Sequence, residues 1–206
     1  VLPCPSGSDY PSCGAGGTHY TQQESYLLIR KVSDSLWQVF GKDGTRTDFE
    51  PIYTEAPNPT LRFGQTRVVD THNNTVTYHW AHNVGANGNT YPWKVTYNGY
   101  TIEFFRETRP DLITRPGHHD VARLGDRLKS VIVKRDPSSL VRAYRLTYTT
   151  SASGKSLLES VQMHGKNAAV VDGTVTGGLT LPAQTFVYQT DPVLASFTGD
   201  AQMSNA

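Results

Sequence analysis

Apolar and polar residues alternate along most of this chain with a period of two. A β-strand has this period because successive side chains point to opposite faces of a sheet. The pattern covers 26–31, 36–40, 67–70, 75–80, 93–97, 101–106, 128–134, 140–148 and 157–163. It is clearest over 140–148, where aromatic and branched side chains suit a pleated surface. No window of similar length has a helical stripe, so the sequence predicts an all-β fold.

Short turn sequences separate these segments. Asp43-Gly44 and Asn98-Gly99 each lie between two strand-like segments, and such pairs favour tight hairpins because Gly and Asn tolerate positive φ. We therefore expect Gly44 and Gly99 to have positive φ, and 149–155 to form a longer hairpin loop. The sequence predicts consecutive antiparallel hairpins, arranged as a twisted sheet or a β-sandwich. Long irregular loops are expected at 110–125 and 165–182, before a last short strand around Phe186.

The 206 residues are enough for one domain or for two small ones. Residues 1–23 are rich in Gly, Ser, Pro and Thr and have no periodicity, which predicts an extended lead-in. A β-rich domain is expected over 24–190, and a flexible tail over 191–206, where residues are small and polar. Because the chain begins with Val1 and not Met, we expect a processed or excised fragment.

The only two cysteines, Cys4 and Cys13, flank a segment rich in Pro, Gly and Ser. In an exported protein this spacing predicts a small disulfide loop. The alternative is a pair of unrelated thiols in a cytosolic chain. A zinc site would need a second pair of ligands at a conventional spacing, which the sequence lacks.

Charge and motif content argue against several kinds of partner. The formal net charge is only +1, and binding to nucleic acid or to an anionic membrane depends on clustered excess Lys and Arg. No segment approaches the roughly 20 apolar residues of a membrane helix. The sequence contains no nucleotide-binding glycine motif and no nucleophile elbow. We expect no nucleic acid, no membrane insertion, no cofactor and no enzymatic activity.

The residues that look most reactive are His118, His119 and Asp120, with Asp111 and Arg115 nearby in sequence. Histidine and aspartate bind metals and transfer protons, so a metal-dependent hydrolase is one alternative. Further histidines that the fold would have to bring close are His72, His79 and His82. The spacing matches neither HExxH nor a 2-His-1-carboxylate site. We therefore expect a solvated loop without a catalytic role.

Aromatic residues suggest a different site. On an exposed sheet face they would form a platform for stacking sugar rings, whereas in the interior they would fill the core, as aromatic residues usually do. The candidates for stacking are Trp37, Trp80, Trp93, Tyr91 and Tyr100. A carbohydrate-binding module that attaches to a cell-surface glycan is therefore a second candidate function.

Five motifs occur in a recognisable order. They are LWQVFGKDGTRTDFE, VVDTHNNTVTYHW, FFRETRPDLITRPG followed by RLKSVIV, VRAYRLTYTTSASGKSLLESVQMHG, and LPAQTFVYQ. In this order, residues 24–189 resemble the second half of the SpvB-type domain found in ABC (Tc) toxin B components and related bacterial RHS/YD-repeat proteins. Asn73 stands where this family usually has Gly.

The resemblance implies a β-sheet scaffold segment of a large secreted or cell-surface toxin-like protein. Its partners would be other domains of the same protein, such as a propeller or an RHS shell. The enzymatic activities of the family lie in other portions, so the resemblance assigns no catalytic residue here. The first half of the usual domain is missing, and the lead-in with Cys4 and Cys13 is not a general family feature.

Overall fold

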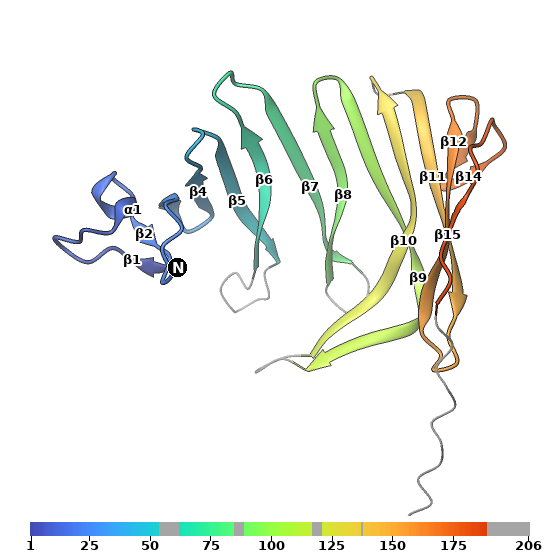
Figure 1. The fold of residues 1–206 in the computed structure, drawn as a ribbon, viewed down its shortest axis with the longest axis horizontal. Coiled ribbons are helices and arrows are strands. Elements are labelled where there is room, and N and C mark those ends of the chain that lie inside the picture. The colour runs from blue at the N-terminus through green and yellow to red at the C-terminus, as the bar shows by residue number, and fades with distance from the viewer. Residues whose placement is uncertain (54–61, 85–88, 117–120, 137, 189–206) are drawn as a thin grey trace, which may run out of the picture.

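In a computed structural model, the chain forms one long antiparallel sheet (Figure 1). The structure describes residues 1–53, 62–84, 89–116, 121–136 and 138–188. Thirteen strands lie in sequence order from β1 to β12, with β15 at the far edge. Their bounds are β1 (Leu2–Pro3), β2 (His19–Tyr20), β3 (Leu28–Ser33), β4 (Leu36–Phe40), β5 (Arg46–Tyr53), β6 (Arg62–Val69), β7 (Thr75–Val84), β8 (Asn89–Tyr97), β9 (Tyr100–Pro116), β10 (Val121–Arg135), β11 (Ser139–Thr150), β12 (Ser156–Gly165) and β15 (Gln184–Thr185).

The all-β prediction is confirmed, and of the two predicted architectures the structure has the open sheet. From β1 to β12 each strand pairs with its neighbour in sequence, as hairpin connections require. Gly44 and Gly99 have φ of 81° and 75° in two of these turns. Within the described residues the one helix, α1 (Pro11–Gly14), has four residues, and no helix is long and apolar enough to cross a membrane.

The irregular loop expected at 110–125 is wrong for the described part of that range. β9 continues to Pro116, and β10 begins at Val121. The residues that suggested a loop, Pro110 and Gly125, lie in a bulge, where Arg109–Leu112 face Gly125 alone between the pairs Thr108↔Asp126 and Ile113↔Leu124. A bulge accommodates Pro because the extra residues do not have to donate to the ladder. Past this bulge the hairpin bends away from β11 (Figure 1).

The irregular loop expected at 165–182 is also wrong in part, because it contains a second, two-stranded sheet. β13 (Ala169–Val171) pairs with β14 (Thr174–Thr176). Asp172 and Gly173 form the turn and have φ of 47° and 71°, which is the combination that a type I′ hairpin requires. The Asp-Gly signal was present in the sequence, but three-residue strands are too short to show a period.

This small hairpin covers one face of the main sheet, which we name the covered face. Ile132 and Ala143 are opposite one another on β10 and β11, and they pack with Val175 of β14 into a buried apolar cluster. Ser130 Oγ donates a hydrogen bond to the Gly173 carbonyl at 2.6 Å. Burial of each large apolar side chain stabilises the fold by about 1.5–3 kcal/mol. The hairpin therefore covers the buried apolar residues of β10 and β11 and contributes Val175 to their cluster.

The opposite face, which we name the open face, is apolar but has no cover within the described residues. Cross-strand partners project to the same side of a sheet, and pairs such as Val95↔Ile102 and Ile102↔Val133 define this side. Its members are Val76, Tyr78, Val95, Tyr97, Tyr100, Ile102, Phe104, Val131, Val133, Tyr144, Leu146, Val161 and Met163. All of them are half-buried or exposed.

The lead-in is docked onto β3 through hydrogen bonds. The hydroxyl of buried Ser12 donates to the His19 carbonyl at 2.6 Å and accepts from the Ile29 amide at 3.0 Å. Cys4 and Cys13 form a disulfide with their Cα atoms 5.7 Å apart. These contacts attach 1–23 to the first strands of the sheet. The tail expected at 191–206 lies outside the described residues.

Replacing Gly173 by Ala should destabilise the fold by about 2–4 kcal/mol, because a Cβ at this positive φ would also overlap the Phe105 ring. Gly154→Ala is the matched control, since Gly154 also has positive φ, 75°, but faces open space. Its expected cost is about 1–2 kcal/mol. Urea denaturation monitored by circular dichroism measures both, and equal losses would contradict the docking of the β13–β14 turn on Phe105.

Candidate functional site

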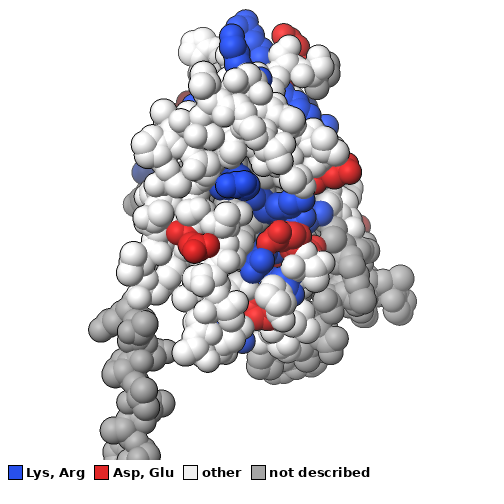
Figure 2. All heavy atoms as spheres, turned by 90° about the vertical axis from the view of Figure 1, so that its right-hand side faces the viewer, with Lys and Arg blue, Asp and Glu red and all other residues white. Residues whose placement is uncertain are grey.

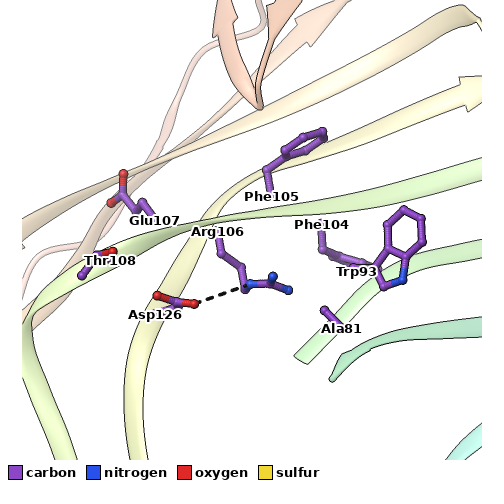
Figure 3. Close-up of a pocket in the computed structure, with 8 residues that line it drawn as sticks. All are labelled: Ala81, Trp93, Phe104, Phe105, Arg106, Glu107, Thr108 and Asp126. Atoms are coloured by element: carbon purple, nitrogen blue, oxygen red, sulfur yellow. Dashed lines mark ion pairs between the residues drawn. The ribbon is translucent and has the colours of Figure 1, made fainter. Parts of the chain in front are cut away.

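A hollow among the described residues opens where β8 and β9 separate. Their pairing ends at Lys94↔Glu103, although β8 begins at Asn89 and β9 continues to Pro116. The hollow has a volume of about 730 Å³ and draws residues from β7, β8, β9 and β10 (Figure 3). They are Ala81, Trp93, Phe104, Phe105, Arg106, Glu107, Thr108 and Asp126.

Arg106 and Asp126 are the charged pair of this hollow (Figure 3). Arg106 Nε lies 3.8 Å from Asp126 Oδ2, which is too long for a good hydrogen bond. The guanidinium carbon is 5.0 Å from the centroid of the Tyr91 ring, and the Tyr91 hydroxyl accepts from the Asp126 amide at 3.4 Å. Arg106 Nε and Nη1 are buried without an acceptor in the described structure. Such donors favour a bound molecule or water that supplies acceptors.

Trp93 forms an exposed apolar wall of the hollow, with 39% of its surface accessible. Lys94 Nζ lies 4.4 Å from its ring centroid, and the His79 ring lies 5.9 Å away. Burial, and then the charge of Lys94, lower the pKa of His79. The arrangement combines donors, an acceptor and an aromatic ring. It has no activated nucleophile.

A second polar cluster is built on the bulge of β9. Arg109 donates to Asp111 through Nε at 3.2 Å and Nη2 at 3.0 Å. Asp111 also accepts from the amide of Ser156, at 2.9 Å, and from its hydroxyl. Arg127 completes the cluster by donating to Glu107 at 2.6 Å and to the Ser156 hydroxyl at 2.9 Å. The bulge thus attaches β9 to the start of β12, two strands beyond β10.

Hydrogen bonds from Arg109, and then from Ser156, hold the pKa of Asp111 well below its usual range. The side chain of Asp111 is only 4% exposed, and every bond that it accepts is intramolecular. The Asp111 cluster is therefore occupied by its own partners. Its role in the described structure is to position the β9–β10 hairpin.

The structure distributes the predicted stacking residues over separate places. Tyr91 and Trp93 lie at the hollow between β8 and β9. Trp37 makes an edge contact with Phe63 at 6.3 Å, and Trp80 donates from its indole to the Gln65 carbonyl at 2.8 Å. Tyr100 lies on β9 and belongs to the open face, whereas Trp37 lies on β4, five strands away. The described residues therefore form no single row of these aromatic rings.

The predicted histidine cluster, His118, His119 and Asp120, lies outside the described residues. Elsewhere in the described chain no three His, Cys, Asp or Glu side chains gather as metal ligands. His82 instead forms a hydrogen bond with the Ile52 carbonyl at 2.7 Å. Sequence reasoning missed Arg106 and Asp126, because only the register of β9 and β10 brings them together. The Arg109 and Asp111 pair, in contrast, was visible as the RPD motif.

Comparisons with known proteins identify the fold. No protein-family model matches the sequence, and no curated protein matches it. Seven chains of solved structures match, including the following two. One is a Tc holotoxin pore from Photorhabdus luminescens that carries a TccC3-D651A mutation, with a TM-score of 0.62 and 15% identity over 82% of this chain. The other is TcdB2-TccC3, with a TM-score of 0.54 and 16% identity over 79% of this chain.

This chain spans 11% of the length of each of those chains. At such low identity the similarity shows a shared fold. The structural neighbours are components of Tc toxins, so the fold of this chain is that of a segment within a much longer toxin polypeptide.

The Asp111→Asn variant should be less stable than the wild type at pH 7, because the charged form of Asp111 receives hydrogen bonds from Arg109 and Ser156. The folded pKa of Asp111 is lowered, so this stabilisation is complete above the unfolded value of about 3.9 and is lost as the pH falls below it. The difference in urea midpoint between variant and wild type should shrink from pH 7 to pH 3. The control is Asp34→Asn, because Asp34 is exposed and paired with Lys31. An exposed ion pair contributes little to stability, so the urea midpoint of this variant should stay close to that of the wild type. A difference that is independent of pH would contradict this role.

Proposed function

We propose that this chain is a scaffold segment of a large exported toxin-like protein, of the SpvB type associated with RHS repeats. It packs against other domains of the same protein and carries no reaction of its own. Support comes from the five ordered motifs and from the fold shared with Tc toxin components. The disulfide between Cys4 and Cys13 fits an exported protein.

The observation that carries this proposal is the small core of a large sheet. Among the described residues the buried apolar side chains are Ile29, Ile52, Ile132, Ala143 and Val175. A domain that is stable by itself normally packs two layers around one core, and an uncovered apolar face favours association. A segment that is covered by neighbouring domains has no need of a second layer of its own.

The charged surface is consistent with a structural role. Figure 2 shows the molecule from the side of β12 and β15. On this side, acidic and basic side chains lie next to one another within a largely uncharged surface. Buried Asp48 is a further example, paired with Arg67 at 2.7 Å and Arg46 at 3.1 Å. The pair of Asp48 and Arg67 connects β5 to β6.

The native polypeptide should be several times larger than the 22.7 kDa of this chain, since domains rarely exceed about 250 residues and a scaffold needs further domains to pack against. An antibody raised against residues 139–165 would detect it on an immunoblot of the producing cells and their medium under reducing, denaturing conditions. Peptide mass spectrometry of the band would identify the flanking sequence. A native product of 22.7 kDa would contradict the scaffold proposal.

A second candidate function is carbohydrate binding at the hollow between β8 and β9. Sugar hydroxyls both donate and accept hydrogen bonds, which matches the unpaired donors of Arg106 and the carboxylate of Asp126. Trp93 offers an exposed ring beside them. Pockets of this size commonly combine such apolar walls with a few polar groups.

If the hollow binds a glycan, the Arg106→Met variant should bind at least about tenfold more weakly, since loss of a charged hydrogen bond removes about 1.5–3 kcal/mol. A glycan array followed by calorimetry with the best oligosaccharide measures this. Arg135→Met is the matched control, because Arg135 also lies over a tyrosine ring but on Tyr100, away from the hollow. Absence of any array signal for the wild type, or equal loss in both variants, would reject this candidate.

A further inference from the structure

We infer that the open face over β7 to β12 is an interface, covered in the native protein by an apolar face of a neighbouring domain in the same polypeptide. This inference rests on the proposed scaffold function and adds to it the surface, the chemistry of the partner and its covalent connection to this chain.

The chemistry of the open face is uniform across the sheet. One row runs through Tyr78, Val95, Ile102 and Val133, each opposite the next on adjacent strands. A parallel row contains Phe104, Val131, Tyr144 and Met163. Charged side chains enter only at the ends of rows, where Arg135 and Arg142 lie 5.8 and 5.9 Å from the ring centroids of Tyr100 and Tyr144. An apolar centre with a polar rim is the pattern of a protein interface.

The two faces show what a cover does. Ile132 and Ala143 are fully buried beneath the β13–β14 hairpin. Tyr97 and Tyr100 on the open face retain 45% and 40% of their exposure. The covered face is also the more polar of the two away from the hairpin, with Lys94, Thr96 and Glu103 on its central strands. The apolar side of the sheet is thus the one that no described part of the chain covers.

The open face also has the relief that a packed partner fills. A groove of about 470 Å³ lies on it over β8 to β11, toward the turn between Tyr97 and Tyr100. Its lining residues are Val95, Tyr97, Tyr100, Ile102, Val133, Val141 and Arg142. Sheets that pack face to face interdigitate side chains over about 10 Å, so apolar side chains of a facing layer suit this groove. A charged partner would lose its hydration there without compensation.

The area of the open face favours a tethered domain over a second copy of this chain. Six strands about 4.8 Å apart, each contributing about 20 Å of its length, give roughly 500–600 Å² on this side. The total of about 1,000–1,200 Å² lies within the range of interfaces between domains of one chain. It is at or below the lower limit for stable association of separate proteins. A covalent linker compensates for a small area by raising the effective concentration to the order of millimolar.

Hydroxyl-radical footprinting of the 206-residue chain and of the longer native polypeptide tests this inference. Tyr97 and Tyr100 should be oxidised readily in the 206-residue chain and about fivefold or more slowly in the longer polypeptide, where an interface core would pack as densely as a protein interior. Tyr10 and Tyr26, which are 42% and 58% exposed near the lead-in, serve as internal controls. Equal oxidation of Tyr97 and Tyr100 in both proteins would overturn the inference while leaving the scaffold proposal intact.

Two measurements on the 206-residue chain distinguish a neighbouring domain from a second copy of this chain as the partner that covers the open face. The chain should be monomeric by sedimentation and should bind the apolar dye ANS, with a several-fold weaker signal in the Ile102→Thr, Val133→Thr variant. The matched control is Thr96→Ser, Thr101→Ser, on the other face of neighbouring strands, which should leave the signal unchanged. A dimer that the Ile102 and Val133 substitutions dissociate would show that a second copy covers the face, and would overturn the inference. A native product of only 22.7 kDa would reject both this inference and the scaffold proposal.

Discussion

The structure depends on how a single-layer sheet obtains cover for its apolar side chains. A strand with one buried face needs a second layer against that face, and here the second layer is a hairpin of two three-residue strands. At its turn Gly173 contacts the Phe105 ring and accepts a hydrogen bond from Ser130. The buried cluster of Ile132, Ala143 and Val175 forms beneath it. Where this cover ends, the remaining side chains stay half-exposed.

The same limitation explains the polar bracing of the long β9–β10 hairpin. Beyond Lys94↔Glu103 this hairpin has no partner on the β8 side, and a two-stranded ribbon is only marginally stable in water. The bulge at Arg109–Leu112 redirects Asp111 toward Ser156, and Arg127 reaches the same hydroxyl. On the other side Arg106 lies over Tyr91. Side-chain hydrogen bonds and the contact of Arg106 with the Tyr91 ring thus hold in place the part of the hairpin that has no backbone pairing with β8.

These features favour a segment that completes itself against neighbours. The chain shares its fold with parts of Tc toxin components and spans a small share of their length. Its open face is apolar with charges at the rim, whereas the hollow between β8 and β9 mixes donors with acceptors. The first feature suits a domain interface, and the second suits a small polar ligand.

The sequence by itself determined the all-β class, most of the longer strands and the hairpin turns that place consecutive strands side by side. These depend on period-two alternation and on Asp-Gly and Asn-Gly turns such as those at Gly44 and Gly99, which are local properties. Local reasoning failed where a breaker residue is accommodated by its partner strand, as Pro110 is opposite Gly125. It also failed for the β13–β14 hairpin, whose strands are too short to show a period. Only the tertiary structure decided which sheet face is covered and which polar side chains meet. Arg106 approaches Asp126, and Asp111 approaches Ser156, through strand register and bulges that no local pattern encodes.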